Sequence, residues 1–167
     1  KLLEVSLDVE TTGLEEDAEL LGGSLCPSPG KATYLVRDDL LEVLKKAQPW
    51  TIKGHNLKFD LKVLARNGFD LNKFTYEDTE LLAYCMAYED LRLKTLETQE
   101  LNLWHPSFED VTTGKENLSE QPIEVVARYC NQDTDATERL WGSLAGKAEP
   151  REMKLYNTIE KPLMPAL

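Results

Sequence analysis

Residues 3–10 alternate between apolar and polar side chains, which is the period of a half-buried β-strand. Two more strand-like stretches follow at residues 19–26 and 32–36, and a breaker rich in proline and glycine separates them. Because consecutive strands joined by short connections tend to pair side by side, this pattern predicts a β-meander at the start of the chain.

The spacing of the apolar residues then changes from two to three and four, which is the period of an α-helix. One helix is predicted with Asp38 as its N-cap and with its end before Pro49. A buried strand at residues 50–54 and a helix at 57–67 follow, and Gly68 behind that helix is typical of a left-handed C-cap.

The second half of the chain is predicted to be mostly helical. One helix covers residues 78–88, and a long helix begins at 119–122 and runs to about Leu144. The stretch 89–117 is polar and irregular, with a short helix at 93–101. Strands followed by alternating helices and strands predict an α/β fold, with a mixed central sheet flanked by helices.

The composition narrows the class of protein. The 167 residues, of which 41% are hydrophobic, fit one globular domain and exclude a fibrous or wholly disordered chain. No stretch approaches the roughly 18 to 20 apolar residues of a membrane span, and the first residues lack the pattern of a signal peptide. Cys26, Cys85 and Cys130 have the spacing of neither a disulfide framework nor a zinc site. We therefore expect a soluble monomer with reduced cysteines and no membrane partner, in the cytoplasm or an equivalent reducing compartment.

The net charge limits how the chain can hold nucleic acid. With 30 acidic and 19 basic residues, the formal charge is −11. Broad electrostatic binding to a phosphate backbone requires lysine and arginine, so this balance argues against it. Carboxylates gathered at one site and neutralised by divalent cations would still attract phosphate locally.

One acid falls on an apolar stripe of the last predicted helix. Val126, Tyr129, Asp133, Ala136 and Leu140 recur at spacings of three and four and share one face. A buried ionised carboxylate costs several kcal/mol unless it is paired or bound to a metal. The alternative is an exposed edge of the stripe, and this position alone leaves both interpretations open.

A second anomaly lies in the first strand. Asp8 and Glu10 project from the same face, and like charges that close repel each other. Lysine and arginine are absent from residues 2–30, so a divalent cation is the natural counter-charge, unless the strand end simply exposes two surface acids. Hard oxygen ligands favour Mg²⁺ or Mn²⁺ over zinc.

A fourth acid, Asp60, follows a strand-to-helix junction, where it either stabilises the helix N-terminus or joins the others at one end of the sheet. Such a cluster could hold two cations for in-line displacement at a phosphodiester. Tyr129 would orient the attacking water, because a tyrosine with a pKa near 10 is a poor base at neutral pH.

Three segments carry a resemblance to a known family. DVETTGL at 8–14, NLKFD at 56–60 and YCNQD at 129–133 resemble the three exonuclease motifs of the DnaQ-like superfamily. The tyrosine four residues before the last aspartate is similar to the tyrosine branch of the four-acid (DEDD) exonucleases. Together with Asp78-Thr79 and the tail at 159–163, the segments most resemble the 3′-5′ proofreading exonuclease domain of family A (polymerase I type) DNA polymerases.

The resemblance implies a ribonuclease H-like (DnaQ-like exonuclease) fold with two divalent cations, Mg²⁺ or Mn²⁺. It also implies removal of 3′-terminal nucleotides from single-stranded or frayed DNA as 5′-monophosphates. Residues 1–147 would form the exonuclease domain. Residues 148–167 would begin a helix that leads into a polymerase region of the same polypeptide, so we expect a fragment of a longer protein that binds substrate weakly by itself.

The resemblance also assigns roles to single residues. Asp8, Glu10 and Asp133 would hold the inner cation, and Asp8 would bridge to the second. Asp60 would act on the second cation largely through water, and Tyr129 would position the nucleophile.

The same resemblance places substrate contacts at Thr11, Leu14, Asn56 and Phe59, next to the last nucleotides. Each of them has a plainer interpretation from the sequence pattern: Thr11 as a turn residue, Leu14 and Phe59 as core, and Asn56 as a loop hydrogen-bonding residue. They remain open here.

Three basic residues, Lys58, Lys62 and Arg66, recur at helical spacing, either to guide a phosphate backbone or as a solvated face. His55 and His105 have no partner at ligand spacing and receive no role. Three rival functions remain. They are a 3′-5′ exoribonuclease of the same branch, an inactive exonuclease-like module that holds DNA, and an Asp-x-Asp phosphatase, which Glu10 at the second aspartate position disfavours.

Overall fold

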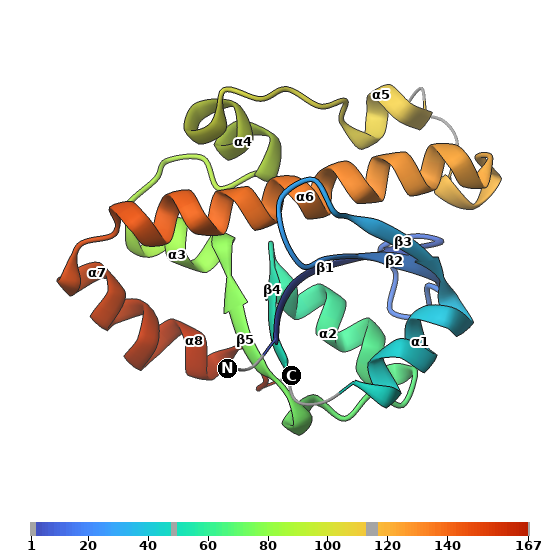
Figure 1. Cartoon of the computed structure of the whole chain (residues 1–167), viewed down its shortest axis with the longest axis horizontal. Coiled ribbons are helices and arrows are strands. Elements are labelled where there is room, and N and C mark those ends of the chain that lie inside the picture. The colour runs from blue at the N-terminus through green and yellow to red at the C-terminus, as the bar shows by residue number, and fades with distance from the viewer. Residues whose placement is uncertain (1–2, 48–49, 113–116, 167) are drawn as a thin grey trace.

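A five-stranded mixed sheet forms the centre of the described part of the chain. The computed structural model describes residues 3–47, 50–112 and 117–166. The strand order is β3-β2-β1-β4-β5 (Figure 1). The first three strands pair antiparallel, whereas β1, β4 and β5 pair parallel, so the predicted meander and the mixed sheet are both confirmed. The strands are β1 (Leu3–Thr11), β2 (Leu20–Cys26), β3 (Thr33–Val36), β4 (Trp50–Gly54) and β5 (Thr75–Asp78).

Helices cover both faces of this sheet. Helix α6 crosses one face, α1 and α2 pack on the other, and α4 and α5 run alongside α6 on the side away from α1 and α2 (Figure 1). None of the helices in the described ranges is both long and apolar enough to cross a membrane. The helices are α1 (Arg37–Lys46), α2 (Leu57–Arg66), α3 (Thr79–Cys85), α4 (Leu93–Leu101), α5 (Phe108–Thr112), α6 (Ile123–Lys147), α7 (Pro150–Leu155) and α8 (Lys161–Leu163), with short turns at Leu71–Lys73, Leu118–Glu120 and Tyr156–Glu160.

Several element boundaries differ from the sequence expectation. Helix α1 follows β3 directly with Val36 as its N-cap, so Asp38 lies in the first turn and does not cap the helix. Helix α3 ends at Cys85 instead of residue 88, because the chain turns at Ala87 with a positive φ of 60°. The polar stretch contains α5 in addition to the expected α4, and its residues 113–116 lie outside the described part.

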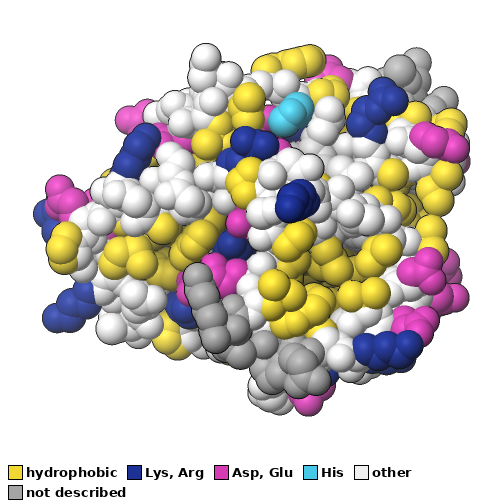
Figure 2. Space-filling model, viewed as in Figure 1, with side chains coloured by type: hydrophobic (Ala, Val, Ile, Leu, Met, Phe, Trp, Pro, Cys, Tyr) yellow, Lys and Arg dark blue, Asp and Glu magenta, His cyan; other side chains and the backbone are white. Residues whose placement is uncertain are grey.

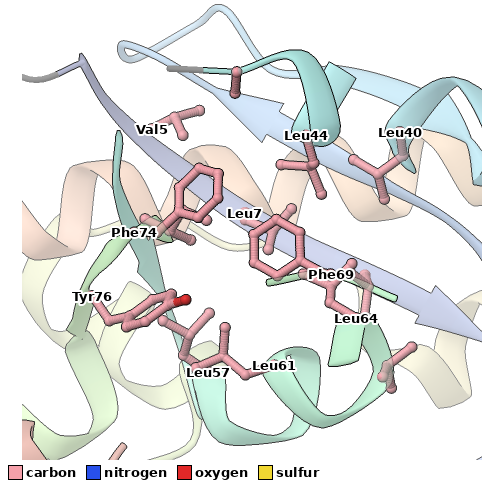
Figure 3. Close-up of a cluster of buried hydrophobic side chains, with 14 of the residues drawn as sticks. Val5, Leu7, Leu40, Leu44, Leu57, Leu61, Leu64, Phe69, Phe74 and Tyr76 are labelled. Carbon is pink, nitrogen blue, oxygen red and sulfur yellow. The ribbon is translucent and has the colours of Figure 1, made fainter. Parts of the chain in front are cut away.

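Two apolar clusters hold the layers together. The first lies between the sheet and helices α1 and α2, and Figure 3 shows leucines of both helices and Val5 and Leu7 of β1 gathered around Phe69 and Phe74. The second lies between α3, α4, α6 and the C-terminal helices, and includes the fully buried Tyr156. Since the apolar residues of β1 fill the first cluster, the polar residues between them must face α6.

Strand β1 has two different neighbours along its length. It pairs with β2 as far as Thr11, but its parallel pairing with β4 ends at Ser6. Beyond that point β4 gives way to helix α2, so the two strands diverge. The carboxyl-terminal half of β1 therefore has an open edge, which is the usual location of a site in an α/β sheet.

Candidate active site

Two acids of β1 lie beneath helix α6, as the alternation of the strand predicts. The Sγ of Cys130 in α6 donates to the carbonyl oxygen of Asp8 at 3.4 Å and lies 3.6 Å from its carboxylate Oδ2. The side-chain ligand atoms of Asp8, Glu10 and Cys130 all lie within 4.8 Å of one another. The strand thus presents two carboxylates side by side to the helix, and Glu10 is buried.

Asp60 reaches the same place from the first turn of α2. Its Oδ1 accepts a hydrogen bond of 2.9 Å from the backbone N–H of Val9. That amide lies in the part of β1 that β4 has left, so the carboxylate takes the position of a neighbouring strand. Asp60 is buried, and its charge repels those of Asp8 and Glu10.

Asp133 of α6 completes the cluster. Its side chain is buried, with 8% of the residue exposed, so the buried interpretation of the apolar stripe holds and the exposed edge does not. The hydroxyl of Tyr129, one turn earlier, is hydrogen-bonded to this carboxylate. The Nζ of Lys94 in α4 also pairs with Asp133, and it lies 5.5 Å from the centroid of the Tyr129 ring.

The acids repel one another in a site where burial weakens their solvation. Burial, followed by the charge of Asp133, raises the pKa of Asp8 to about 7. Burial and the charge of Asp8 raise the pKa of both Glu10 and Asp60 well above the usual range. Burial also raises the pKa of Asp133, although Lys94 and Tyr129 oppose the shift. The cluster contains more negative charge than its one lysine neutralises.

This excess of charge fits divalent cations. The donors are carboxylate oxygens, the hard ligands that Mg²⁺ and Mn²⁺ prefer. The Cys130 thiol beside them has a pKa raised well above its usual range by burial and by Asp8, so it stays protonated and is a poor metal ligand. The residues present therefore suit an oxygen-ligated cation and not a thiolate-bound zinc.

A cleft of about 380 Å³ opens beside the acids. Of the residues expected to touch substrate, Thr11, Leu14 and Phe59 line it together with Tyr129 and the acids Asp8, Glu10 and Asp133. Leu14 is 86% exposed and projects from the turn after β1, so it is not a core residue. Phe59 is half-buried against the first apolar cluster.

Asn56 does not line this cleft. It is the N-cap residue of α2, in the left-handed region with a φ of 55°, and its exposed side chain makes no capping hydrogen bond. Its backbone N–H donates to the Asp78 carboxylate at 3.2 Å. The structure therefore brings together the four acids, Tyr129 and three of the four expected substrate contacts, and leaves Asn56 at the edge.

Two residues at this site were missed by the sequence reasoning. The absence of lysine and arginine from residues 2–30 suggested that no salt-bridge partner was near, but Lys94 supplies one from α4. Phe108 of α5 lines the cleft with 42% of its surface exposed. An exposed aromatic next to a loop was the only available signal for Phe108, and no local signal marked Lys94.

The basic and histidine candidates from the sequence do not line the cleft. Lys58, Lys62 and Arg66 are exposed on α2. On the face shown in Figure 2, lysine and arginine side chains lie apart from one another and do not form a stripe. Both histidines have partners: His55 Nδ1 lies 2.8 Å from Thr79 Oγ1, and His105 Nδ1 pairs with Glu97. The three cysteines are buried and free, as predicted.

Solved structures share this fold. Brucella melitensis NrnC with bound Mg²⁺ has a TM-score of 0.69 and 21% identity, over 99% of this chain and 83% of that one. Escherichia coli RNase D, an exoribonuclease involved in structured RNA processing, has a TM-score of 0.70 and 14% identity, over 99% of this chain and 44% of that one. The predicted ribonuclease H-like fold of the DEDD exonucleases is therefore confirmed.

Sequence relatives point to one branch of that fold. A DNA polymerase DpoZ of Acinetobacter phage SH-Ab 15497 is 29% identical over 96% of this chain, and DNA polymerase I of Borreliella burgdorferi is 29% identical over 95%. The chain spans only 29% and 19% of the length of these relatives. The family described as 3′-5′ exonuclease matches residues 1–149. The chain belongs to the 3′-5′ exonuclease domains of family A DNA polymerases, of the DEDD type.

Proposed function

We propose that this domain removes 3′-terminal nucleotides from DNA as 5′-monophosphates, by two-metal-ion hydrolysis, and proofreads for a polymerase region of the same polypeptide. The observation that carries the proposal is the convergence of Asp8, Glu10, Asp60 and Asp133, from three separate elements, in one cluster beside the cleft, with the last three of them buried. Uncompensated carboxylates cost stability, so their presence together is best explained by cations that bind there.

The cations would be Mg²⁺ or Mn²⁺, and NrnC of Brucella melitensis, which shares this fold, has been solved with bound Mg²⁺. Asp8, Glu10 and Asp133 would hold one, and Asp8 with Asp60 would hold the other. When bound, such a pair lowers the pKa of the attacking water and neutralises charge on the leaving oxygen. The protein itself contributes the fixed position of each carboxylate, which sheet, helix and backbone hydrogen bonds determine.

Tyr129 would orient the nucleophile without taking its proton. Burial, followed by the charge of Asp133, raises the pKa of its hydroxyl far above the usual value. The hydroxyl therefore keeps its proton at neutral pH and acts as a hydrogen-bond donor next to the acids. The ammonium group of Lys94 lies 5.5 Å from the centroid of the Tyr129 ring, within range of a cation–π interaction.

The 3′ end would enter the cleft beside the acids. Leu14 and Phe108 project apolar surface into it, on which the flat faces of unpaired bases can stack. A second groove of about 770 Å³ shares Phe108, Tyr129 and Asp133 with the cleft and continues past Trp104 and Arg92. That groove would give a single strand a path to or from the cleavage site. Thr11 at the end of β1 and Asn56 at the start of α2 would contact the last nucleotides.

DNA is favoured as the substrate because the sequence relatives that cover nearly the whole chain are DNA polymerases. RNase D has the same fold at lower identity, so an exoribonuclease is the second candidate. An inactive DNA-holding module is disfavoured because all four acids and Tyr129 are present. The division at residue 147, the monomeric state and the linked polymerase region belong to this proposal.

The test uses 5′-labelled single-stranded DNA and RNA of matched sequence with Mg²⁺ or Mn²⁺. We expect shortening of the DNA from its 3′ end, with release of 5′-monophosphates. Asp8→Asn should reduce the rate by about 10³-fold, because it removes the carboxylate shared by both cations. Asp39→Asn, an equal charge change on the exposed side of α1, should leave the rate unchanged.

The outcomes separate the candidates. Faster shortening of RNA than of DNA would favour the exoribonuclease. Absence of shortening of both, in a protein that is folded and binds the oligonucleotide, would favour the inactive module. An Asp8→Asn variant as active as the parent would contradict the proposed site.

A further inference from the structure

Lys94 lies between two buried carboxylates, and only one of them belongs to the catalytic cluster. Its Nζ is hydrogen-bonded to Asp133 Oδ1 and lies 3.8 Å from Oε2 of Glu97. Glu97 is three residues further along α4, on the same side of the helix. Its side chain is 1% exposed, so it is the more deeply buried of the two partners.

Glu97 has unused hydrogen-bonding capacity. His105 Nδ1 contacts Oε1 as an ion pair, yet neither carboxylate oxygen has a well-aligned hydrogen bond. Burial raises the pKa of Glu97, and the charges of Lys94 and His105 oppose that shift. Leaving a buried acceptor unsatisfied costs about 1 to 3 kcal/mol. A closer approach of Lys94 to Glu97 would therefore be favourable.

Lys94 and the proposed divalent cation compete for Asp133. The proposed divalent ion needs its carboxylate, and the ammonium group already pairs with it. A divalent ion and an ammonium group repel each other at one carboxylate, so binding of one disfavours binding of the other. Glu97 offers Lys94 an alternative partner, because its Oε2 lies 3.8 Å from Nζ and the flexible lysine side chain can rotate towards it.

We propose that Lys94 is an exchangeable counter-ion, which holds Asp133 in the metal-free protein and transfers to Glu97 when a divalent cation binds. The inference rests on the proposed metal site. Lys94 is a positioning residue and not a catalytic one: it keeps the repelling acids together before cations arrive. Its pairing with Asp133 also sets the cation concentration at which the site fills.

The proposal fixes the direction of two substitutions. Lys94→Met removes the competitor, so Mn²⁺ should bind about tenfold more tightly. Glu97→Gln removes the alternative partner, so Lys94 stays on Asp133 and Mn²⁺ should bind several-fold more weakly. In the Lys94→Met background, Glu97→Gln should have no further effect, because no ammonium group is left to transfer.

Mn²⁺ binding measured by the electron paramagnetic resonance signal of the free ion reports these effects without reference to activity. Lys154→Met, which removes the same charge from an exposed position on α7, is the matched control and should bind Mn²⁺ as the parent does. Thermal melts without metal establish that each variant is folded.

Each result decides the question. A parent protein that binds no Mn²⁺ overturns both the metal site and this inference. A parent that binds Mn²⁺ while Lys94→Met binds it equally or more weakly overturns the inference alone. Equal losses from Glu97→Gln in both backgrounds mean simple charge attraction and also overturn it.

A measurement on the parent protein guards against variants that do not fold. Reductive ¹³C-methylation of the lysines gives Lys94 a methyl resonance, assigned by its loss in Lys94→Arg. Titration with diamagnetic Mg²⁺ should shift this resonance as the ammonium group changes partner. A resonance that stays unchanged while Mg²⁺ saturates the site would refute the exchange.

Discussion

Helix α6 holds two carboxylates on successive turns, Asp133 and Glu138, each with 11% of its side chain exposed, in opposite surroundings. Glu138 accepts from Lys53 Nζ at 2.8 Å and from Ser6 Oγ at 2.5 Å, so each of its oxygens has a donor. Asp133 shares a single lysine with Glu97 and faces the acids of β1. The charge of Glu138 is therefore balanced by its donors, whereas the surroundings of Asp133 have excess negative charge.

A third buried acid shows the same distinction. Asp78, the N-cap of α3, accepts from backbone N–H groups on both sides of it, at distances from 2.8 to 3.4 Å, the donors being residues 56, 57, 80 and 81. It is as buried as any member of the cluster and yet serves only to join β5, α2 and α3. Burial of a carboxylate therefore does not mark a site. A shortage of donors around several carboxylates does.

The largest difference between the two kinds of acid is expected when one of each is neutralised without changing its shape. Asp60→Asn should lower nuclease activity by about 100-fold or more, equivalent to about 3 kcal/mol, while its amide oxygen still accepts from Val9. The melting temperature in EDTA should be unchanged or higher, because repulsion with Asp8 is relieved. Oligonucleotide cleavage and thermal melts measure the two quantities.

Glu138→Gln should give the reverse result. Among the described residues, it leaves the Glu4 carboxylate at 3.7 Å as the one charged partner of the buried Lys53, so we expect a loss of about 3 kcal/mol and a fall of roughly 10 °C in melting temperature. Activity well below that temperature should stay within a few-fold of the parent. If Glu138→Gln lost activity as Asp60→Asn does, the distinction between the two kinds of acid would be wrong.

The pH dependence of stability gives a smaller effect of the same origin. The pKa of Asp8 is raised by burial to about 7 in the folded protein, from 3.8, so the folded state binds this proton more tightly. The contribution of Asp8 to stability should therefore be complete below about pH 3.8 and be lost as the pH rises through about 7. In EDTA, the melting temperature of the parent should drop between about pH 5 and about pH 8. The drop should be larger than that of Asp8→Asn by several degrees.

The comparison with Asp8→Asn is needed because His55 acts in the opposite direction. Burial lowers its pKa to about 4, so its contribution is lost as pH falls below its unfolded value of 6.5. His55 is unchanged in both proteins, and the difference between their melting curves isolates the acid cluster. Saturating Mg²⁺ should remove the extra drop in melting temperature that the parent shows relative to Asp8→Asn. If the extra drop persisted with Mg²⁺, it would count against cation binding.

The smallest effect is expected at Leu14. Because its side chain is 86% exposed, Leu14→Ala should change the melting temperature by less than about 1 °C. It should raise KM for a single-stranded oligonucleotide several-fold, through loss of apolar contact with the terminal base. An unchanged KM would place the 3′ end elsewhere in the cleft.

The sequence predicted those parts of the site that local periodicity controls. The alternation of β1 placed Asp8 and Glu10 on one face, and the apolar stripe of α6 placed Asp133 inside. It could not predict Lys94 or Phe108, because their positions depend on how α4 and α5 pack against α6. The Lys94 contact joins residues 39 apart in the chain, and no short-range pattern encodes it.

The errors in element boundaries have an equally local cause. Asp38 was expected to cap a helix, but β3 continues into α1 without an intervening turn, and this leaves Val36 at the cap. The helix expected at 78–88 stops early where Ala87 adopts a conformation usually reserved for glycine or asparagine. Both depend on backbone dihedral angles that side-chain patterns specify only weakly.

Strands β1 and β4 separate after Ser6, and the amide of Val9 is satisfied by a side chain from α2. Pairing of the strands alone therefore does not assemble the four acids, because Asp60 reaches them through the docking of α2 and Asp133 through that of α6. A substitution that shifts α2 on the sheet should move Asp60 away from the acids of β1 even where every strand stays paired.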